Sequence, residues 1–169
     1  AYHDLKRIHE LPGKKVFIKG NHDYWWQSLK KLKALDFDSI EFIQNTAFEF
    51  QEYIISGTRG WISKDSDYFT EEDNKIYRRE LMRLELSLSH IKDKDKKRIV
   101  MLHYPPFNMD LSPNEFVNIM EKFDVDICIY GHLHSEGHKQ VVEGNIQGIS
   151  FHCVSSDYIN FSPKLIMGE

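Results

Sequence analysis

The stretch ICIYGHLH, residues 127–134, joins four apolar residues to a glycine and two histidines. The apolar run is too short for a typical helix and is typical of a buried strand. The same context recurs where residues 99–102 (IVML) run into His103, and where residues 16–18 (VFI) lead to residues 20–23 (GNHD). Because sites in open α/β sheets form beyond the carboxyl ends of the strands, these turns predict one shared site, made of Asn21, His22, His103, His132 and His134.

Helices are predicted between these strands. The clearest follows Thr70, where apolar residues step by 4, 3, 4 and 3 along residues 77–91. Other helices are expected over residues 1–11, over residues 23–35, and from the SPNE sequence at residues 112–115, which is typical of a capping box with proline at the first helical position.

Further strands are expected at residues 40–43, 47–50, 53–56 and 146–154. Short apolar strands between amphipathic helices predict an α/β layered domain. Because no helix separates some of these later strands, a mixed sheet or a sandwich is expected. The sequence shows no repeat or linker, so residues 1–169 are interpreted as a single domain.

Composition excludes several classes of protein. Of the 169 residues, 41% are hydrophobic and 28% charged, which argues against a disordered chain. No apolar run approaches the roughly 20 residues that span a membrane. The net charge of −4 argues against nucleic acid as a partner. Cys128 and Cys153 lie in apolar stretches and are predicted to be buried free thiols, which indicates a reducing cytoplasm.

The side chains in the three turns suit a divalent metal. Imidazole nitrogen binds Zn, Fe, Ni or Mn, and an amide or carboxylate oxygen can complete the ligand shell. A single histidine after a strand is more often a structural residue, but three turns with the same context favour a metal site. The other histidines lack this context and are interpreted as structural or surface residues, although His138 stays open because it is close to the site in sequence.

The three turns together resemble the calcineurin-like metallophosphoesterases. The pattern of that family is Asp-x-His, Gly-Asp, Gly-Asn-His-Asp/Glu, a lone His, and Gly-His-x-His, and this chain matches the last three blocks in order at residues 20–23, 103 and 131–134. Residues 11–15 and 24–26 are also similar to a subgroup of predicted bacterial phosphohydrolases. The resemblance implies a layered β-sandwich flanked by helices.

The Asp-x-His and Gly-Asp blocks are not found upstream of Gly20. The resemblance therefore implies an N-terminally incomplete domain whose N-terminal strands are missing. An incomplete sheet leaves an edge exposed, through which copies of the chain are expected to self-associate. If the isolated chain were fully active, Asp126, Asp157 and His138 would be the first replacements to consider for the missing ligands.

The resemblance implies a phosphohydrolase that cleaves phosphoesters with water activated by two divalent metal ions (Mn, Fe, Zn or Ni). Asn21, His103 and His132 would bind the second ion and His134 the first. His22 would be the general acid, or a donor to the phosphoryl oxygens, and Asp23 would orient it. With these ligands alone, the chain is expected to bind one ion tightly at most and to turn over phosphoesters poorly.

Arg59 is a candidate substrate-binding residue because arginine suits bidentate contact with phosphate. The alternative is an arginine stacked on Trp61 in a surface loop. Two other functions also fit the resemblance. The first is a non-catalytic protein-binding scaffold on the same fold, and the second is a metal-dependent nuclease, against which the net charge argues.

Overall fold

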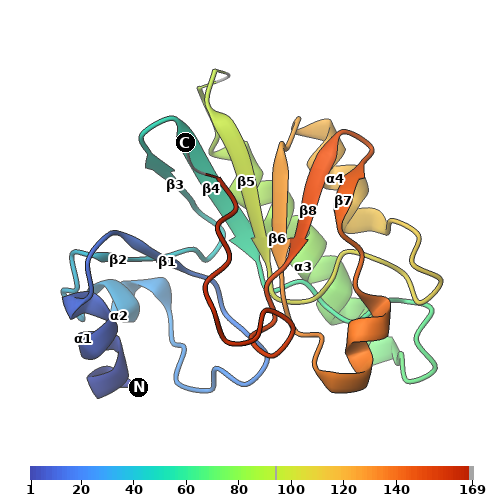
Figure 1. Ribbon diagram of the computed structural model, residues 1–169, viewed down its shortest axis with the longest axis horizontal. Helices are drawn as coiled ribbons and strands as arrows, with labels where there is room; N and C mark the ends of the chain where they lie inside the picture. The colour runs from blue at the N-terminus through green and yellow to red at the C-terminus, as the bar shows by residue number, and fades with distance from the viewer. Residues whose placement is uncertain (94, 168–169) are drawn as a thin grey trace.

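The computed structural model describes residues 1–93 and 95–167. Eight strands form two sheets, and the helices pack around them (Figure 1). The helices are α1 (Tyr2–Glu10), α2 (Leu29–Lys33), α3 (Glu71–Ser89) and α4 (Glu115–Lys122), with one 3-10 turn, η1 (Ser135–Gln140). The strands are β1 (Lys15–Phe17), β2 (Ile40–Phe42), β3 (Ala47–Phe50), β4 (Tyr53–Thr58), β5 (Lys97–Leu102), β6 (Ile127–Tyr130), β7 (Gly144–Ile146) and β8 (Ile149–Cys153).

The larger sheet has six strands in the order β3-β4-β5-β6-β8-β7. Strands β4, β5, β6 and β8 are parallel, and the edge strands β3 and β7 are antiparallel to their neighbours. Because Leu102 pairs with Tyr130, the turns that follow β5 and β6 leave the same end of the sheet. The predicted α/β layered fold with a mixed sheet is confirmed.

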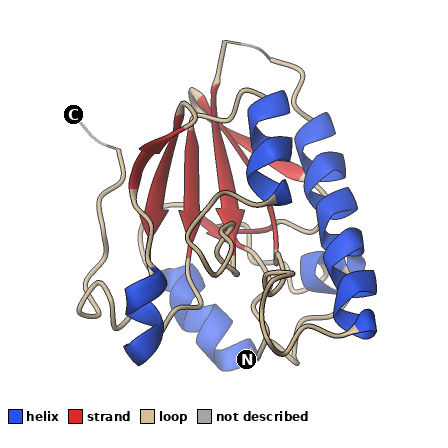
Figure 2. Ribbon diagram, turned by 90° about the vertical axis from the view of Figure 1, so that its right-hand side faces the viewer, coloured by secondary structure: helices blue, strands red, loops and turns tan. Residues whose placement is uncertain are grey.

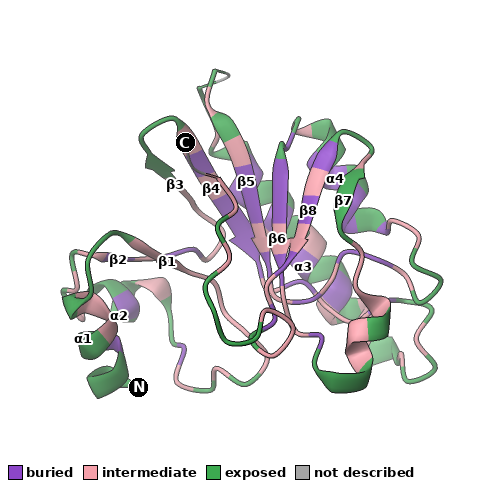
Figure 3. Cartoon of the chain, viewed as in Figure 1, coloured by how far each residue is buried: buried purple, intermediate pink, exposed green. Residues whose placement is uncertain are grey.

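The main core lies between this sheet and helices α3 and α4, which cover one of its faces (Figures 1 and 2). Alternate strand residues such as Val100, Cys128 and Phe151 are fully buried against Leu84 and Met120 of the helices. The purple segments of Figure 3 trace this core. The segment after β8 runs past the opposite face of the sheet (Figures 1 and 2).

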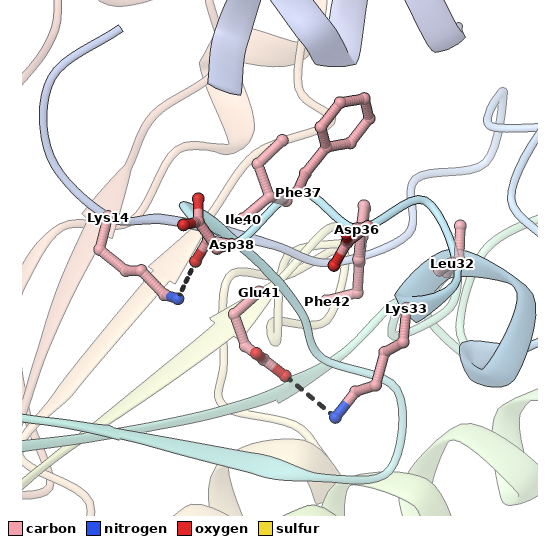
Figure 4. Close-up of a pocket in the computed structure, with 9 residues that line it drawn as sticks. All are labelled: Lys14, Leu32, Lys33, Asp36, Phe37, Asp38, Ile40, Glu41 and Phe42. Atoms are coloured by element: carbon pink, nitrogen blue, oxygen red, sulfur yellow. Dashed lines mark hydrogen bonds and ion pairs between the residues drawn. The ribbon is translucent and has the colours of Figure 1, made fainter. Parts of the chain in front are cut away.

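The smaller sheet pairs β1 with β2 in parallel and packs with α1 and α2 around a second core. Trp26 and Leu32 are buried there with Phe42. A hollow of about 230 Å³ between α2 and β2 (Figure 4) is lined by both signs of charge. Lys33 lies 3.6 Å from Glu41 there, and the Lys14 ammonium donates to the Asp38 backbone carbonyl.

Some of the helices predicted from the sequence match the structure, and others differ from it in extent or in their cap. The helix after Thr70 is confirmed, with a reciprocal capping box between Thr70 and Asp73. The helix predicted over residues 23–35 is confirmed only over Leu29–Lys33, and the rest of that range is not helical. The cap predicted at Ser112 is wrong: Asn114 caps α4 by accepting from the Phe116 amide, while Pro113 pairs in an isolated bridge with Phe107.

Among the described residues, no helix is long and apolar enough to span a membrane. Cys128 and Cys153 are buried and free, as the sequence predicts.

Candidate metal centre

The turns after β1, β5 and β6 meet in one pocket of about 330 Å³. Within it, the side-chain oxygen of Asn21 lies 2.7 Å from Nε2 of His103, and Nδ1 of His132 lies 3.0 Å from the same nitrogen. The structure thus brings together residues that are 82 and 29 positions apart in the chain. The pocket is lined by Ile18, Gly20, Asn21, His22, Asp23, His103, His132 and His134.

The close approach of the first turn to His103 depends on Gly20. A Cβ atom at position 20 would lie 3.1 Å from Oδ2 of Asp23 and 3.3 Å from Nδ1 of His103, which is tighter than most real contacts. The Asp23 carboxylate accepts hydrogen bonds from the Gly20 amide at 2.6 Å and from the Trp25 indole at 2.9 Å. Asp23 therefore organises the turn that carries Asn21, and its effect on His22 stays a prediction.

The turn after β6 holds its two histidines in different directions. His132 has φ of 72°, a left-handed conformation that is costly for a residue with a Cβ and that occurs most often at functional sites. Its ring faces His103, whereas Nδ1 of His134 lies 2.7 Å from Oδ1 of Asp157. His134 lines the same pocket but does not join the cluster of Asn21, His103 and His132.

Asp157 holds the far side of this turn. Its carboxylate accepts from the Ser135 amide at 3.0 Å and lies 3.1 Å from Nε2 of His138. The Ser135 amide and then the His134 ring keep the pKa of Asp157 well below its usual range. The sequence pattern gave Asp157 no positioning role, because it follows β8 in a loop with no recognisable motif. Asp126 lies at the opposite end of the sheet, where it accepts from the amide of Arg98.

Burial sets the charge state of the histidine cluster. Burial, and after it the neighbouring His132, lowers the pKa of His103 to about 4. Burial also lowers the pKa of His132, with His134 acting in the same sense. Both rings are therefore neutral at pH 7, and a neutral imidazole has the lone pair that binds a metal.

The cluster has the donor set and spacing of a metal site with mixed ligands. With metal–ligand bonds of about 2.0–2.1 Å, neighbouring ligand atoms lie roughly 3 Å apart, which is comparable with the separations at Nε2 of His103. Among the described residues, no group of three or more His, Cys, Asp or Glu side chains is arranged to hold an ion, either in this cluster or elsewhere. The amide oxygen of Asn21 supplies the third donor, so these residues fit one divalent ion.

A family model described as calcineurin-like phosphoesterase matches residues 2–136. The chain belongs to the calcineurin-like phosphoesterase family. No curated protein and no solved structure matches it at a significant level. The matched range includes all three metal-competent turns of this calcineurin-like phosphoesterase and ends before Asp157. Membership indicates a phosphoesterase-type function, and the family typically uses divalent metals.

Arg59 lies beside the centre of this calcineurin-like phosphoesterase and outside the pocket of the histidine cluster. Its guanidinium carbon is 4.2 Å from the centre of the Trp61 ring, and its NH2 group is 3.5 Å from the buried carboxylate of Glu80. Its carbonyl accepts from the amides of His103 and Tyr104, so it supports the turn after β5. The stacking on Trp61 that the sequence suggested is present, and contact of Arg59 with substrate stays a prediction.

Proposed function

We propose that this chain is a metal-dependent phosphohydrolase whose reaction takes place in the pocket formed by the turns after β1, β5 and β6. The observation that supports the proposal most directly is the approach of Asn21 Oδ1 and His132 Nδ1 to the same nitrogen, Nε2 of His103. Two neutral imidazoles at the end of the larger sheet and one amide oxygen from the turn after β1 can hold a divalent ion, and family membership supplies the reaction class.

Asn21, His103 and His132 would hold one ion, and His134, whose Nδ1 is engaged by Asp157, would offer Nε2 to a second. When bound, Mn, Fe, Zn or Ni ions supply Lewis-acid polarisation of the phosphoryl oxygens and a lowered pKa for the attacking water. Because three donors converge on one side and a single histidine stands on the other, one ion is bound more tightly than the other.

His22 is the proposed general acid. It is exposed on the rim of the pocket and lies in the turn that Asp23 organises. From there its ring can donate a proton to the leaving oxygen of the ester, or a hydrogen bond to the phosphoryl group. Asp23 acts on His22 through the shape of this turn.

Two further properties are part of the proposal. The free thiols of Cys128 and Cys153 support a reducing compartment, and we place the protein in the cytoplasm. The edge strand β3 carries Phe48 and Phe50 with their rings stacked 6.3 Å apart, and Phe50 is 42% exposed. This edge supports self-association of the chain.

The test measures bound metal and, in parallel, hydrolysis of phenyl phosphate, whose basic phenolate leaving group makes the rate sensitive to a general acid. His132→Ala removes a metal ligand, so it should lower metal content first and the rate as a consequence. His22→Ala should retain metal and slow hydrolysis by about 10²–10⁴-fold, the range for a lost general acid. His90→Ala is the control, because His90 is exposed, its ring contacts the Asn45 carbonyl, and it does not line the pocket of the cluster. Full metal content and full rate in His132→Ala would contradict the proposal.

A further inference from the structure

We infer that the substrate of this phosphoesterase carries an aromatic ester group, and that an uncharged pocket beside His132 binds its ring. The inference rests on the proposed function for its reaction, but the pocket has its own observations. His132 lines both this pocket and the pocket of the histidine cluster, so the two adjoin at its side chain. A phosphoryl group at the metal centre would therefore lie next to this pocket, and its ester group can reach the pocket by extending past His132.

The walls of this pocket are aromatic and apolar. It has a volume of about 270 Å³ and lies between the loops after β4 and β5 and the turn after β6. Among the described residues that line it, none is Asp, Glu, Lys or Arg, although such residues make up 28% of the chain. The large aromatic and apolar residues that line it are Trp61, Tyr68, Tyr104, Phe107, Met109 and Leu133.

The aromatic walls are held in place by the protein itself. The Trp61 indole donates to Asp73 at 2.9 Å, and the ring centres of Trp61 and Tyr104 are 5.3 Å apart. Tyr104 in turn lies 4.1 Å from His132, ring centre to ring centre, and is followed by Pro105. Walls that are fixed before a ligand arrives lose little entropy when it binds, which favours a flat, rigid ligand.

Two polar residues of the pocket, Ser63 and Asn108, favour an aromatic ring over a sugar. The Ser63 hydroxyl donates to Asp65 and lies 3.1 Å from Oδ1 of Asn108, while Nδ2 of Asn108 donates to Ser112 at 3.0 Å. These groups already have partners, whereas a sugar would need several free ones.

A polyanionic ester group is disfavoured for a different reason. Lys19, Arg79 and Arg83 line a separate pocket together with Arg59 and Glu80. Lys64, which follows Ser63 in the chain, is paired with Glu115 at 2.6 Å. Since no cation faces the uncharged pocket among the residues described as lining it, a second phosphate there would be unpaired.

The experiment introduces a charge at the rim of the pocket. Met109 is 47% exposed, so Met109→Glu can fold normally while placing a carboxylate beside the bound ring. Met82→Glu is the matched control, since Met82 is 62% exposed on α3 and is not among the residues that line either pocket. KM is measured for 1-naphthyl phosphate and for methyl phosphate, and 1-naphthol binding is measured by titration calorimetry.

KM of each variant is divided by KM of the wild-type protein for the same ester. This ratio removes the difference in intrinsic reactivity between the two esters, and comparing the ratios removes the repulsion between the new carboxylate and either phosphate. Met109→Glu should raise KM for 1-naphthyl phosphate about tenfold more than KM for methyl phosphate, and should weaken 1-naphthol binding by a similar factor. Met82→Glu should do neither.

Equal changes in KM for the two esters, or unchanged 1-naphthol binding in Met109→Glu, would overturn the inference and leave the proposed function standing. A different outcome is that neither the wild type nor the two variants hydrolyse either ester, while Met109→Glu alone weakens 1-naphthol binding. That result would contradict the proposed function and support the pocket as a binding site for an aromatic ring.

Discussion

Nδ1 of His134 lies 2.7 Å from Oδ1 of Asp157, 23 residues further along the chain. A carboxylate on one ring nitrogen fixes the orientation of an imidazole and leaves the other nitrogen free for a ligand. Asp157 also binds the amide of Ser135, so one side chain holds both the ring and the backbone of the turn after β6. It is therefore a positioning residue for His134.

Asp157→Ala should lower metal affinity by about 10–100-fold, the usual cost of losing the partner of a ligating histidine. Titration with Mn²⁺ or Zn²⁺ measures it directly. Asp124→Ala is the control, because the Asp124 carboxylate is 89% exposed and pairs with Arg98. Equal metal affinity in the two variants would show that His134 needs no such partner.

Glu80 is expected to be important for stability. Its carboxylate is buried between Thr58, Arg83 and Arg59, with Arg83 at 2.7 Å. Glu80→Gln leaves both arginines without their counter-charge, so we expect a loss of about 3 kcal/mol in the free energy of unfolding, measured in urea. Glu85→Gln on the exposed side of α3 should change it by less than about 0.5 kcal/mol. A similar small change for Glu80→Gln would mean that the network contributes little.

The low pKa of His103 should make the metal-free protein less stable in weak acid. In the unfolded chain His103 takes up a proton below about pH 6.5, whereas in the folded protein its pKa is about 4. As the pH falls from 7 to 5, the unfolded state gains a proton that the folded state does not, so the free energy of unfolding decreases, by about 1–2 kcal/mol. His132, whose pKa is also lowered, acts in the same direction.

Urea titrations at pH 7, 6 and 5 in the presence of a chelator measure this dependence. His103→Gln has no titrating ring at position 103 and should show a shallower dependence, while His90→Gln should keep that of the wild type. An equally steep dependence in His103→Gln would assign the effect to other groups.

The edge strand β3 should determine whether copies of the chain associate. Phe50→Lys places a charge on this edge and should shift the protein toward monomer in sedimentation velocity. Leu165→Lys, at a residue that is 79% exposed after β8, should leave the distribution unchanged. A wild-type protein that stays monomeric at high concentration would refute the proposal.

The buried strands, and the histidines at their carboxyl ends, could be predicted from the sequence better than the turns that follow them. Short apolar runs such as residues 99–102 and 127–130 predict buried strands because burial on both faces demands such residues, and the parallel register then places His103 and His132 together. Helix α3 could also be predicted, since its apolar stripe and its cap at Thr70 both indicate a helix that begins after residue 70.

Side-chain contacts that cross the chain could not be predicted in this way. The apolar spacing of residues 23–35 suggested a helix, but Asp23 uses its carboxylate to close the turn at Gly20, and helix α2 begins at Leu29. The apolar residues of this segment still pack together in the second core, as Trp26 and Leu32 show. Burial alone therefore does not separate a helix from a compact turn.

The parallel pairing of β4, β5, β6 and β8 has a consequence for the order in which the protein forms. Each parallel pair joins segments separated by a long connection, and such pairings are slow to close during folding. The donors at Asn21, His103 and His132 can meet only after β1 has docked and β5 has paired with β6. If the proposed site binds a metal ion, the ion would be captured only after these elements have assembled. The rate of metal uptake by refolding chains would then report the time needed to complete the sheet.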